Sequence, residues 1–542
     1  MTRTYAETDL LDGFTPFSVE RAYGYRTAGY WAGKPLCSLL TEAAVRWPSH
    51  TAVVDQTQSH TFAELDRLAD AAGAGFAALG IRPGDRFLLQ LPNSVRFAIT
   101  LFGLLRAGAV PVMCLPAHRH AELSHFVAVS GAVGLVIADQ AAGFDHREPA
   151  RTLVAEHPGL RHVIVDGDAA EFISWSSLFT DGTAKPPVLP IDTTEPALLL
   201  ASGGTTGAPK LIPRTHDDYL YNATASAHVC EMSHRDTYLV VLPAAHNFPL
   251  ACPGLLGAMS AGATTVFTAD PSPESSFAVI ARHGVTATAL VPALAKLWTQ
   301  ACDWEPQRPS TLRLLQVGGA KLAATDAAAV RDTLTPGLQQ VFGMAEGLVN
   351  YTRPGDSVDL LDHTQGAPLC PADELRIVDE DGTEVAPGQE GELLVRGPYT
   401  LNGYYRAPRE NKRSFSPDGF YRTGDRVRRL TNGYLEVTGR IKDVIHRGGE
   451  TVSAPDIEEH LLTHPAIAAA AAVPVPDPYL GEKICAAVVF RGPSVDLPEL
   501  HSYLDGRGLA PHSRPDTLLA LPSLPLTAVG KVDKKAIIAT LS

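Results

Sequence analysis

A glycine- and threonine-rich stretch from Ser202 to Lys210 is the strongest local signal for chemistry in the sequence. It reads SGGTTGAPK and follows a short apolar run at 196–203. Glycines leave the backbone free to wrap an anion, threonine hydroxyls can donate to phosphate oxygens, and Lys210 adds a positive charge. A Walker A loop is excluded, because Pro209 precedes the lysine and Leu211 stands where a Ser or Thr would hold magnesium. The stretch predicts a phosphate-binding loop, with a flexible surface loop as the alternative.

Two isolated carboxylates follow later in the chain, each beside glycine. Glu346 is the only acid in residues 339–353, QQVFGMAEGLVNYTR. A lone carboxylate after a strand suits Mg²⁺ beside a triphosphate, whereas the alternative is a buried helix cap. Asp425, in YRTGD, is either an ordinary turn residue or an acceptor for the hydroxyl groups of a ribose.

Short apolar runs alternate with helical patterns through the first 200 residues. The strands and helices that they predict must position the turns that carry the candidate residues. Runs this short and this apolar are typical of strands buried on both faces, so the expected fold class is α/β, with helices covering parallel or mixed sheets. The runs lie at 51–55, 85–92, 133–139, 161–167 and 196–203. The segment from Phe62 to Leu79 predicts a helix, with Thr61 as its cap and Gly80 as its stop.

The sequence pattern changes at about residue 373. Alternating segments separated by DG, PG and NG turns predict a small antiparallel β unit that extends to residue 440. The remaining residues contain a predicted helix at Ala454 to Leu462 and predicted strands at Ile467 to Val475 and Lys483 to Phe490. This is enough for a compact α+β domain, so we place a domain boundary near residues 440–442.

Composition excludes several classes of protein. The 542 residues are 45% hydrophobic and 19% charged, which is typical of globular chains and not of disordered, collagen-like or coiled-coil ones. The net charge of -14 opposes binding to nucleic acid. Seven scattered cysteines without a CxxC pair argue against a disulfide framework or a zinc site. Without a secretory signal or an apolar stretch of about 18 residues, we expect a cytoplasmic protein with no membrane partner.

Five motifs in a fixed order give the sequence a resemblance to the adenylate-forming superfamily, which includes acyl-CoA synthetases and the adenylation domains of nonribosomal peptide synthesis. They are the loop at 202–210, GMAEG, YRTGD, GRIKD and the terminal pair Gly530-Lys531. Three further stretches look like the stand-alone aryl acid adenylating enzymes of siderophore pathways, typified by 2,3-dihydroxybenzoate-AMP ligase. These are LIPRTHDDY (211–219), AAHNFPLACPG (244–254) and VFGMAEGLVNYTR (341–353).

The resemblance implies a large N-terminal domain, residues 1–439, and a smaller mobile α+β lid, residues 440–542, with a hinge near Lys442. It gives catalytic roles to Lys531, His246 and Lys442, although by pattern alone Lys531 belongs to a basic, solvated C-terminus. Glu346 would hold Mg²⁺. The residues implied to bind ATP are Ser202, Gly203, Gly204, Thr205, Thr206, Gly207, Lys210, Gly318, Gly319, Phe342, Gly343, Met344, Asp425 and Arg440.

The implied reaction joins an aryl carboxylic acid to AMP, releases pyrophosphate, and then transfers the acyl group to a thiol. Only eleven residues follow Lys531, so we expect the thiol on the phosphopantetheine arm of a separate aryl carrier protein, with free coenzyme A as the alternative. Thr451 stands where the family usually has a lysine, a departure that concerns carrier docking and not adenylation. A non-catalytic nucleotide-binding scaffold is a remote alternative, because the phosphate loop, Glu346 and Lys531 are all present.

The resemblance also implies which residues bind the acid. They are His246, Asn247, Phe248, Cys252, Gly318 and Val349. By composition alone, His246 is a core histidine and Cys252 a small buried residue. With the resemblance, Asn247 faces the 2-hydroxyl group of the acid. Cys252 replaces the serine usual in dihydroxybenzoate enzymes and favours salicylate, because a thiol hydrogen-bonds weakly, whereas Val349 favours 2,3-dihydroxybenzoate. Salicylate ranks first, 2,3-dihydroxybenzoate second and a ring-substituted relative third.

Overall fold

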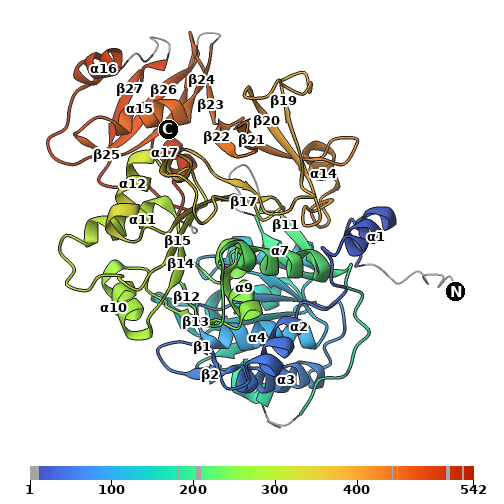
Figure 1. Cartoon of the computed structure of the whole chain (residues 1–542). Helices are drawn as coiled ribbons and strands as arrows, with labels where there is room; N and C mark the ends of the chain where they lie inside the picture. The colour runs from blue at the N-terminus through green and yellow to red at the C-terminus, as the bar shows by residue number, and fades with distance from the viewer. Residues whose placement is uncertain are drawn as a thin grey trace.

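A computed structural model describes residues 11–179, 184–202, 209–441, 443–447, 450–507, 509, 513–527 and 530–541. The predicted site residues that lie outside the described residues are Gly203, Gly204, Thr205, Thr206, Gly207 and Lys442. The chain runs from a lower body, blue to green in Figure 1, to an upper region of orange and red elements.

A seven-stranded sheet forms one layer of the lower body, and all its neighbouring strands except one pair are parallel. Its strands, in spatial order, are β11 (Leu211–Thr215), β10 (Pro196–Ala201), β4 (Val110–Met113), β3 (Arg86–Gln90), β5 (Gly134–Ala138), β8 (His162–Asp166) and β9 (Ile173–Ser174). Four of the predicted apolar runs lie in this sheet, as β3, β5, β8 and β10. The prediction of buried strands is therefore confirmed for them.

A nine-stranded sheet forms the second layer, parallel in its centre and antiparallel at its edges. Its spatial order is β18 (Ala367–Pro368), β17 (Val349–Tyr351), β16 (Leu338–Gly343), β15 (Leu314–Gly318), β14 (Ala287–Leu290), β12 (Thr237–Val240), β13 (Thr264–Phe267), β1 (Thr51–Val54) and β2 (Ser59–Thr61). The carboxyl ends of parallel strands meet at one edge of a sheet. This brings the turns after β12, β15 and β16 near one another.

Helices pack between the two sheets and over their outer faces (Figure 1). The largest core includes buried residues of both sheets and of helices between them. These inner helices include α2 (Ser38–Arg46), α3 (Phe62–Ala78), α4 (Val95–Arg106), α7 (His216–Val229), α8 (Asn247–Ala251) and α9 (Gly254–Ala261). The outer helices are α5 (His120–Ser130) and α6 (Arg147–Glu156) over the first sheet, and α10 (Pro273–His283), α11 (Pro292–Ala301) and α12 (Ala324–Thr333) over the second.

The start of α3 shows how local sequence sets an element. The Thr61 hydroxyl accepts from the backbone N–H of Glu64, and the Glu64 carboxylate accepts from the backbone N–H of Thr61. This capping box satisfies two backbone donors that a helix start leaves unpaired. Gly80 follows the helix with a φ of +81°, a conformation that favours glycine. The predicted cap and stop are both confirmed.

Two smaller sheets form the upper region. The first is antiparallel and contains β19 (Glu374–Val378), β20 (Glu390–Arg396), β21 (Tyr421–Arg429) and β22 (Leu435–Arg440), as predicted. The second contains β23 (Val444–Arg447), β24 (Glu450–Ser453), β25 (Ile467–Asp477), β26 (Gly481–Phe490) and β27 (Thr517–Ala520), packed with α15 (Ala454–Leu462), α16 (Leu497–Gly506) and α17 (Lys534–Leu541). The α/β class is confirmed, while the boundary near residues 440–442 stays a prediction.

Short elements complete the described chain: α1 (Val19–Thr27), β6 (Gln140–Ala141), β7 (Phe144–Asp145), a 3₁₀ helix (Trp175–Phe179), α13 (Val358–His363) and α14 (Pro408–Ser414). Within the described residues, we find no helix that is both long enough and apolar enough to span a membrane.

Candidate active site

Lys531 lies in the turn between β27 and α17 and extends toward the second sheet. A Cβ atom built on Gly319 would lie 3.4 Å from Cε of Lys531, so the lysine side chain passes directly over the turn after β15. Gly319 has a φ of +87°, and because it has no side chain, the lysine can lie against its backbone. The structure thus carries the predicted lysine from near the C-terminus to the edge of the large sheet.

Three charged groups act on Lys531 in this position. The lysine keeps contact with solvent, but burial by surrounding protein is the main cause that lowers its pKa, followed by the charge of Arg440. The carboxylates of Asp425 and Glu346 raise the same pKa and offset part of this effect. Two cations (Lys531, Arg440) and two carboxylates (Asp425, Glu346) from separate parts of the chain are therefore close enough to influence one another.

Asp425 and Arg440 are directly opposite each other on β21 and β22. The Nε atom of Arg440 is 2.8 Å from Oδ1 of Asp425, and the backbone N–H of Asp425 donates to the Thr423 hydroxyl. Asp425 is only 7% exposed, and this burial raises its pKa against the opposing charge of Arg440. A buried carboxylate held in this way can accept hydrogen bonds from a diol, as predicted for a ribose.

Glu346 is held by a tyrosine that the sequence did not single out. The Tyr404 hydroxyl donates to Oε1 of Glu346 at 2.9 Å and lies 2.9 Å from the Tyr421 hydroxyl. Lys210 lies over the ring of the same tyrosine, with Nζ 4.8 Å from the ring centre, and is 2.8 Å from Oε1 of Glu410. Tyr404 therefore links the end of the predicted phosphate loop to the predicted metal ligand. Nothing in the NGYY sequence around it marks this role.

The other nucleotide-site candidates lie at strand ends beside these groups. Ser202 and Lys210 close the base of the predicted phosphate loop, because the Ser202 N–H donates to the Lys210 carbonyl and the Lys210 N–H donates to the Ser202 hydroxyl, both at 2.9 Å. Phe342 and Gly343 end β16. The N–H of Met344 donates to the Leu348 carbonyl and closes the turn that carries Glu346.

His246, Asn247 and Phe248 form the start of α8, which follows β12. The backbone N–H of Phe248 donates to Nδ1 of His246 at 3.3 Å, which places the proton of the neutral ring on Nε2. Burial is the main cause that lowers the pKa of His246 to about 4, and the nearby charge of Lys531 contributes to the same shift. His246 is therefore a neutral group beside Lys531 at neutral pH.

The other acid-site candidates lie in α8 or on neighbouring strands: Cys252 is the C-cap of α8, Gly318 ends β15 and Val349 begins β17. The Phe248 ring lies against Gly318, since a Cβ on this glycine would approach the ring to 3.1 Å. The Nδ2 atom of Asn247 is 3.6 Å from Sγ of Cys252, and burial raises the pKa of this thiol to about 11, so it stays protonated. Val349 shares a face of β17 with Tyr351, whose hydroxyl contacts the same sulfur. The structure thus brings Asn247 next to Cys252 and Phe248 next to Gly318, and Tyr351 connects the strand face of Val349 to the same sulfur.

An α/β fold with a lysine, carboxylates and a group of buried side chains around the ends of parallel strands is an arrangement that suits a nucleotide-using enzyme. The chain matches the model of the AMP-binding enzyme family over residues 40–405, and that of the AMP-binding enzyme C-terminal domain over residues 456–531. It belongs to the AMP-binding enzyme family, which confirms the resemblance inferred from the sequence.

Individual relatives are similar over almost the whole chain. The salicyl-AMP ligase / salicyl-S-ArCP synthetase of Mycobacterium tuberculosis is 65% identical over 98% of this chain and 95% of its own length. The 2,3-dihydroxybenzoate-AMP ligase of Bacillus subtilis is 46% identical over 97% of each chain. Among solved structures, apo MbtA of Mycobacterium smegmatis has a TM-score of 0.78 and 68% identity, and the match covers 98% of this chain and 100% of that one. The roles of single site residues stay predictions.

Proposed function

We propose that this enzyme uses ATP to adenylate an aryl carboxylic acid, salicylate in first place, and then transfers the aryl group to the phosphopantetheine thiol of a separate aryl carrier protein. The observation that carries the proposal is that Lys531 lies between the acid-site residue His246 and the carboxylates Asp425 and Glu346. The names of relatives at 65% and 46% identity support an aryl acid as substrate. We place the product in siderophore or other nonribosomal peptide synthesis.

The chemistry explains why a cation belongs at this point. The carboxylate of the acid must approach the α-phosphorus of ATP, although both groups are anionic. A fixed positive charge offsets this repulsion and stabilises the charge that develops in the transition state. In our proposal Lys531 supplies that charge, and Asp425 with Arg440 orients the nucleotide through its ribose. His246 is neutral, so its Nε2–H can donate to an acid oxygen without adding charge.

Glu346 fits a magnesium ion. The described residues contain no group of three or more His, Cys, Asp or Glu side chains that could hold a metal without a substrate. Mg²⁺ usually binds through one or two carboxylates and takes its other ligands from phosphates and water, which is the donor set that a single Glu346 beside ATP would provide. When bound, the ion would neutralise charge on the phosphates. Tyr404 orients the Glu346 carboxylate for this role.

The same geometry suits a lid that moves between two half-reactions. Lys531 reaches the large sheet from the C-terminal segment, and partly exposed lysines make two of the polar contacts that the described residues show for this segment. Lys296 Nζ donates to the Ala468 carbonyl at 3.1 Å, and Lys321 lies 3.9 Å from Glu459. We propose that residues 440–542 rotate after adenylation, withdraw Lys531 and admit the thiol, with the hinge near Lys442.

Pyrophosphate exchange with a panel of aryl acids tests the adenylation step. We expect exchange with salicylate first and with 2,3-dihydroxybenzoate second, while a panel in which no aryl acid supports exchange would refute the proposal. Thioester formation, measured with a phosphopantetheinylated aryl carrier protein and with free coenzyme A at equal concentrations, then tests the acceptor. Faster transfer to coenzyme A would identify coenzyme A as the acceptor in place of the carrier protein, and the proposal for the adenylation step would still hold.

A further inference from the structure

The amide of Asn247 makes a different contact on each side. Its carbonyl oxygen, Oδ1, accepts a hydrogen bond from the Tyr219 hydroxyl at 2.9 Å. Its nitrogen, Nδ2, points to Sγ of Cys252 at 3.6 Å. Asn247 is 7% exposed and the other two residues are more deeply buried, so no bulk water competes for these contacts. Tyr219 thus occupies the carbonyl and leaves the N–H groups on the side of Cys252.

Tyr219 is a firmly held donor. It lies fully buried on α7, and burial raises its pKa far above the usual range, so the hydroxyl keeps its proton. The Arg214 guanidinium covers its ring, with Cζ 4.5 Å from the ring centre. Arg214 is fixed in turn by Asp218 through Nε at 2.9 Å, by the Ala345 carbonyl through Nη1 and by the Tyr399 carbonyl through Nη2. The hydroxyl that faces Asn247 therefore has little freedom to move.

The surroundings of Cys252 favour the same amide orientation. Asn222 donates through Nδ2 to the Ala251 carbonyl at 2.7 Å and approaches Sγ of Cys252 at 3.8 Å. The sulfur thus faces amide N–H donors from Asn222 and Asn247. A reversed Asn247 amide would turn its NH₂ group toward the protonated Tyr219 hydroxyl and remove the donor from the sulfur. The observed orientation satisfies both neighbours.

We propose that Tyr219 is a positioning residue that fixes the Asn247 amide with its N–H groups toward the acid, so that the site selects a hydrogen-bond acceptor at the 2-position of the ring. This inference rests on the proposed function and specifies what the site recognises. The 2-hydroxyl group of salicylate donates its proton to the neighbouring carboxylate of the same molecule. Its oxygen is then left as an acceptor, which matches an amide N–H. A 2-amino group, as in anthranilate, offers a poor acceptor and further N–H donors.

The test compares acids within one enzyme, by the kcat/KM for pyrophosphate exchange at saturating ATP. In the unmodified protein we expect a clear preference for salicylate over both benzoate and anthranilate. In Tyr219→Phe, kcat/KM for salicylate should fall by roughly 2- to 12-fold, the range of one net hydrogen bond, while the value for benzoate stays the same. The preference for salicylate over anthranilate should narrow, because the amide can turn.

Tyr238→Phe is the matched control. Tyr238 is a buried tyrosine of β12 whose hydroxyl has no hydrogen-bond partner among the described residues, so the same atom is removed without a change at Asn247. We expect the ratio of salicylate to benzoate to stay unchanged in this variant.

The outcomes separate this inference from the proposed function. Equal losses for salicylate and benzoate in Tyr219→Phe would reduce Tyr219 to a packing residue and overturn the inference. Equal use of anthranilate and salicylate by the unmodified protein would overturn it as well, and this result does not depend on whether any variant folds. Failure of the unmodified protein to exchange with any aryl acid would instead remove the proposed function.

Discussion

At the scale of single residues, the role of Lys531 depends on where the chain carries it. Its side chain lies over Gly319, beside the neutral His246 and within the field of Asp425 and Glu346. A lysine needed only while charge develops at phosphorus should affect one half-reaction and spare the other. This asymmetry distinguishes a catalytic lysine from a structural one.

We expect Lys531→Ala to slow adenylation by orders of magnitude and to leave thioester formation from pre-made aryl-adenylate close to its original rate. Pyrophosphate exchange measures the first step, and transfer from synthetic aryl-adenylate to the carrier measures the second. Equal loss in both half-reactions would show that the lysine supports the fold and not the chemistry at phosphorus.

The effect of Cys252 on acid choice also depends on a single atom, because its sulfur sets the strength of the hydrogen bond that the side chain can make to the acid. Replacing the thiol with a hydroxyl in Cys252→Ser should raise kcat/KM for 2,3-dihydroxybenzoate relative to salicylate by roughly 2- to 12-fold, because a hydroxyl hydrogen-bonds better than a thiol. Val349→Leu should move the ratio in the opposite direction, because extra bulk in a packed pocket penalises the larger acid. Ratios that stay constant in both variants would place these side chains outside the acid site.

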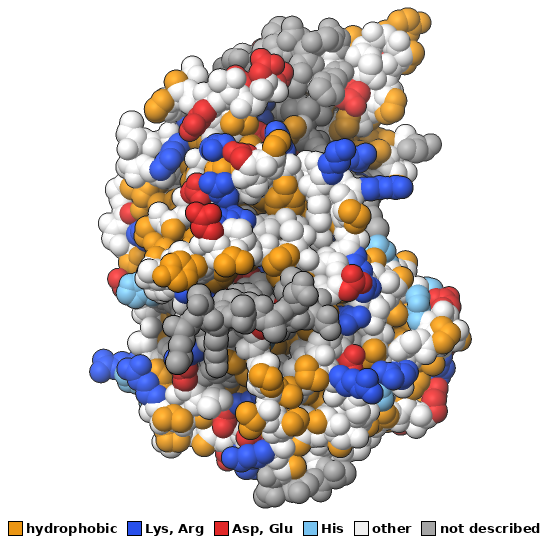
Figure 2. Space-filling view, turned by 90° about the vertical axis from the view of Figure 1, so that its right-hand side faces the viewer, with side chains coloured by type: hydrophobic (Ala, Val, Ile, Leu, Met, Phe, Trp, Pro, Cys, Tyr) orange, Lys and Arg blue, Asp and Glu red, His pale blue; other side chains and the backbone are white. Residues whose placement is uncertain are grey.

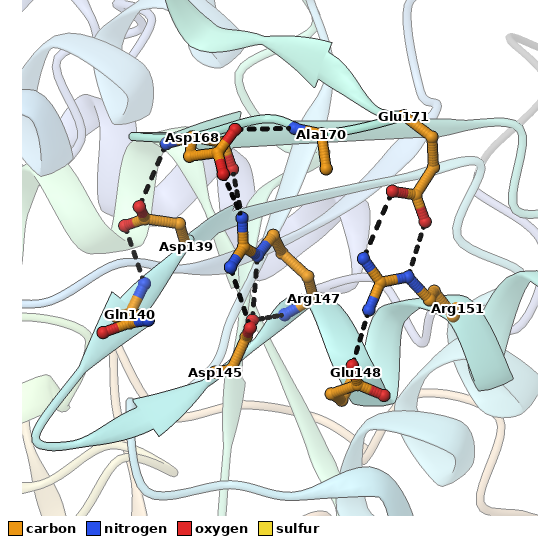
Figure 3. Close-up of polar contacts among 9 residues, drawn as sticks. All are labelled: Asp139, Gln140, Asp145, Arg147, Glu148, Arg151, Asp168, Ala170 and Glu171. Atoms are coloured by element: carbon orange, nitrogen blue, oxygen red, sulfur yellow. Dashed lines mark hydrogen bonds and ion pairs between the residues drawn. The ribbon is translucent and has the colours of Figure 1, made fainter.

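At the scale of elements, ion pairs in this protein differ by their surroundings. Arg214 of β11 and Asp218 at the start of α7 have side chains that are 0% and 3% exposed. At the surface, Arg147 and Arg151 of α6 pair with Asp145 of β7 and with acids of the loop at 168–171, as Figure 3 shows. Figure 2 shows acidic and basic side chains interspersed in the same way over one face. Water screens such surface pairs but not the buried one.

Arg214→Ala should lower the free energy of unfolding by about 3–5 kcal/mol, because it leaves the Asp218 carboxylate buried without its partner. Arg151→Ala, which breaks the exposed contacts to Glu148 and Glu171, should cause little change. Urea unfolding followed by tryptophan fluorescence compares the two variants. If both variants shift the unfolding curve by the same amount, burial does not determine how much these ion pairs contribute to stability.

At the scale of the whole molecule, the proposed cycle requires the C-terminal segment to adopt two positions. The described position places Lys531 at the large sheet, and in the proposed cycle it is the one required for the adenylation step. The contacts of Lys296 with Ala468 and of Lys321 with Glu459 are partly exposed, so they can be broken at low cost. A hinge in the connecting segment would then allow the second position.

Lys442→Pro tests the hinge. Proline fixes φ near -65° and should trap one orientation of the segment, so we expect pyrophosphate exchange to continue while transfer to the thiol falls sharply. Lys442→Ala is the matched control, because it removes the same side chain without restricting the backbone. Unchanged thioester formation in the proline variant would place the hinge elsewhere.

Much of the fold follows from short stretches of sequence. The helix of α3 and its capping box, the buried strands of the first sheet and the antiparallel strands after residue 373 depend on neighbours within a few residues. The order of five motifs likewise indicated the AMP-binding enzyme family without any structure. Patterns of this kind are local, because capping, turn chemistry and strand burial are set by adjacent residues.

The partners of buried polar groups were decided only by the tertiary structure. Tyr404 meets Glu346, Tyr219 meets Asn247, and Arg214 meets the Ala345 carbonyl across separations of 58, 28 and 131 residues. A tyrosine or arginine in the sequence carries no mark of the acceptor that it will reach, because that choice depends on which helices and strands pack together. Burial then makes each such contact obligatory, since an unpaired polar group inside the protein is costly. The sequence thus determined which chemistry the chain carries, and packing decided how its groups are aimed.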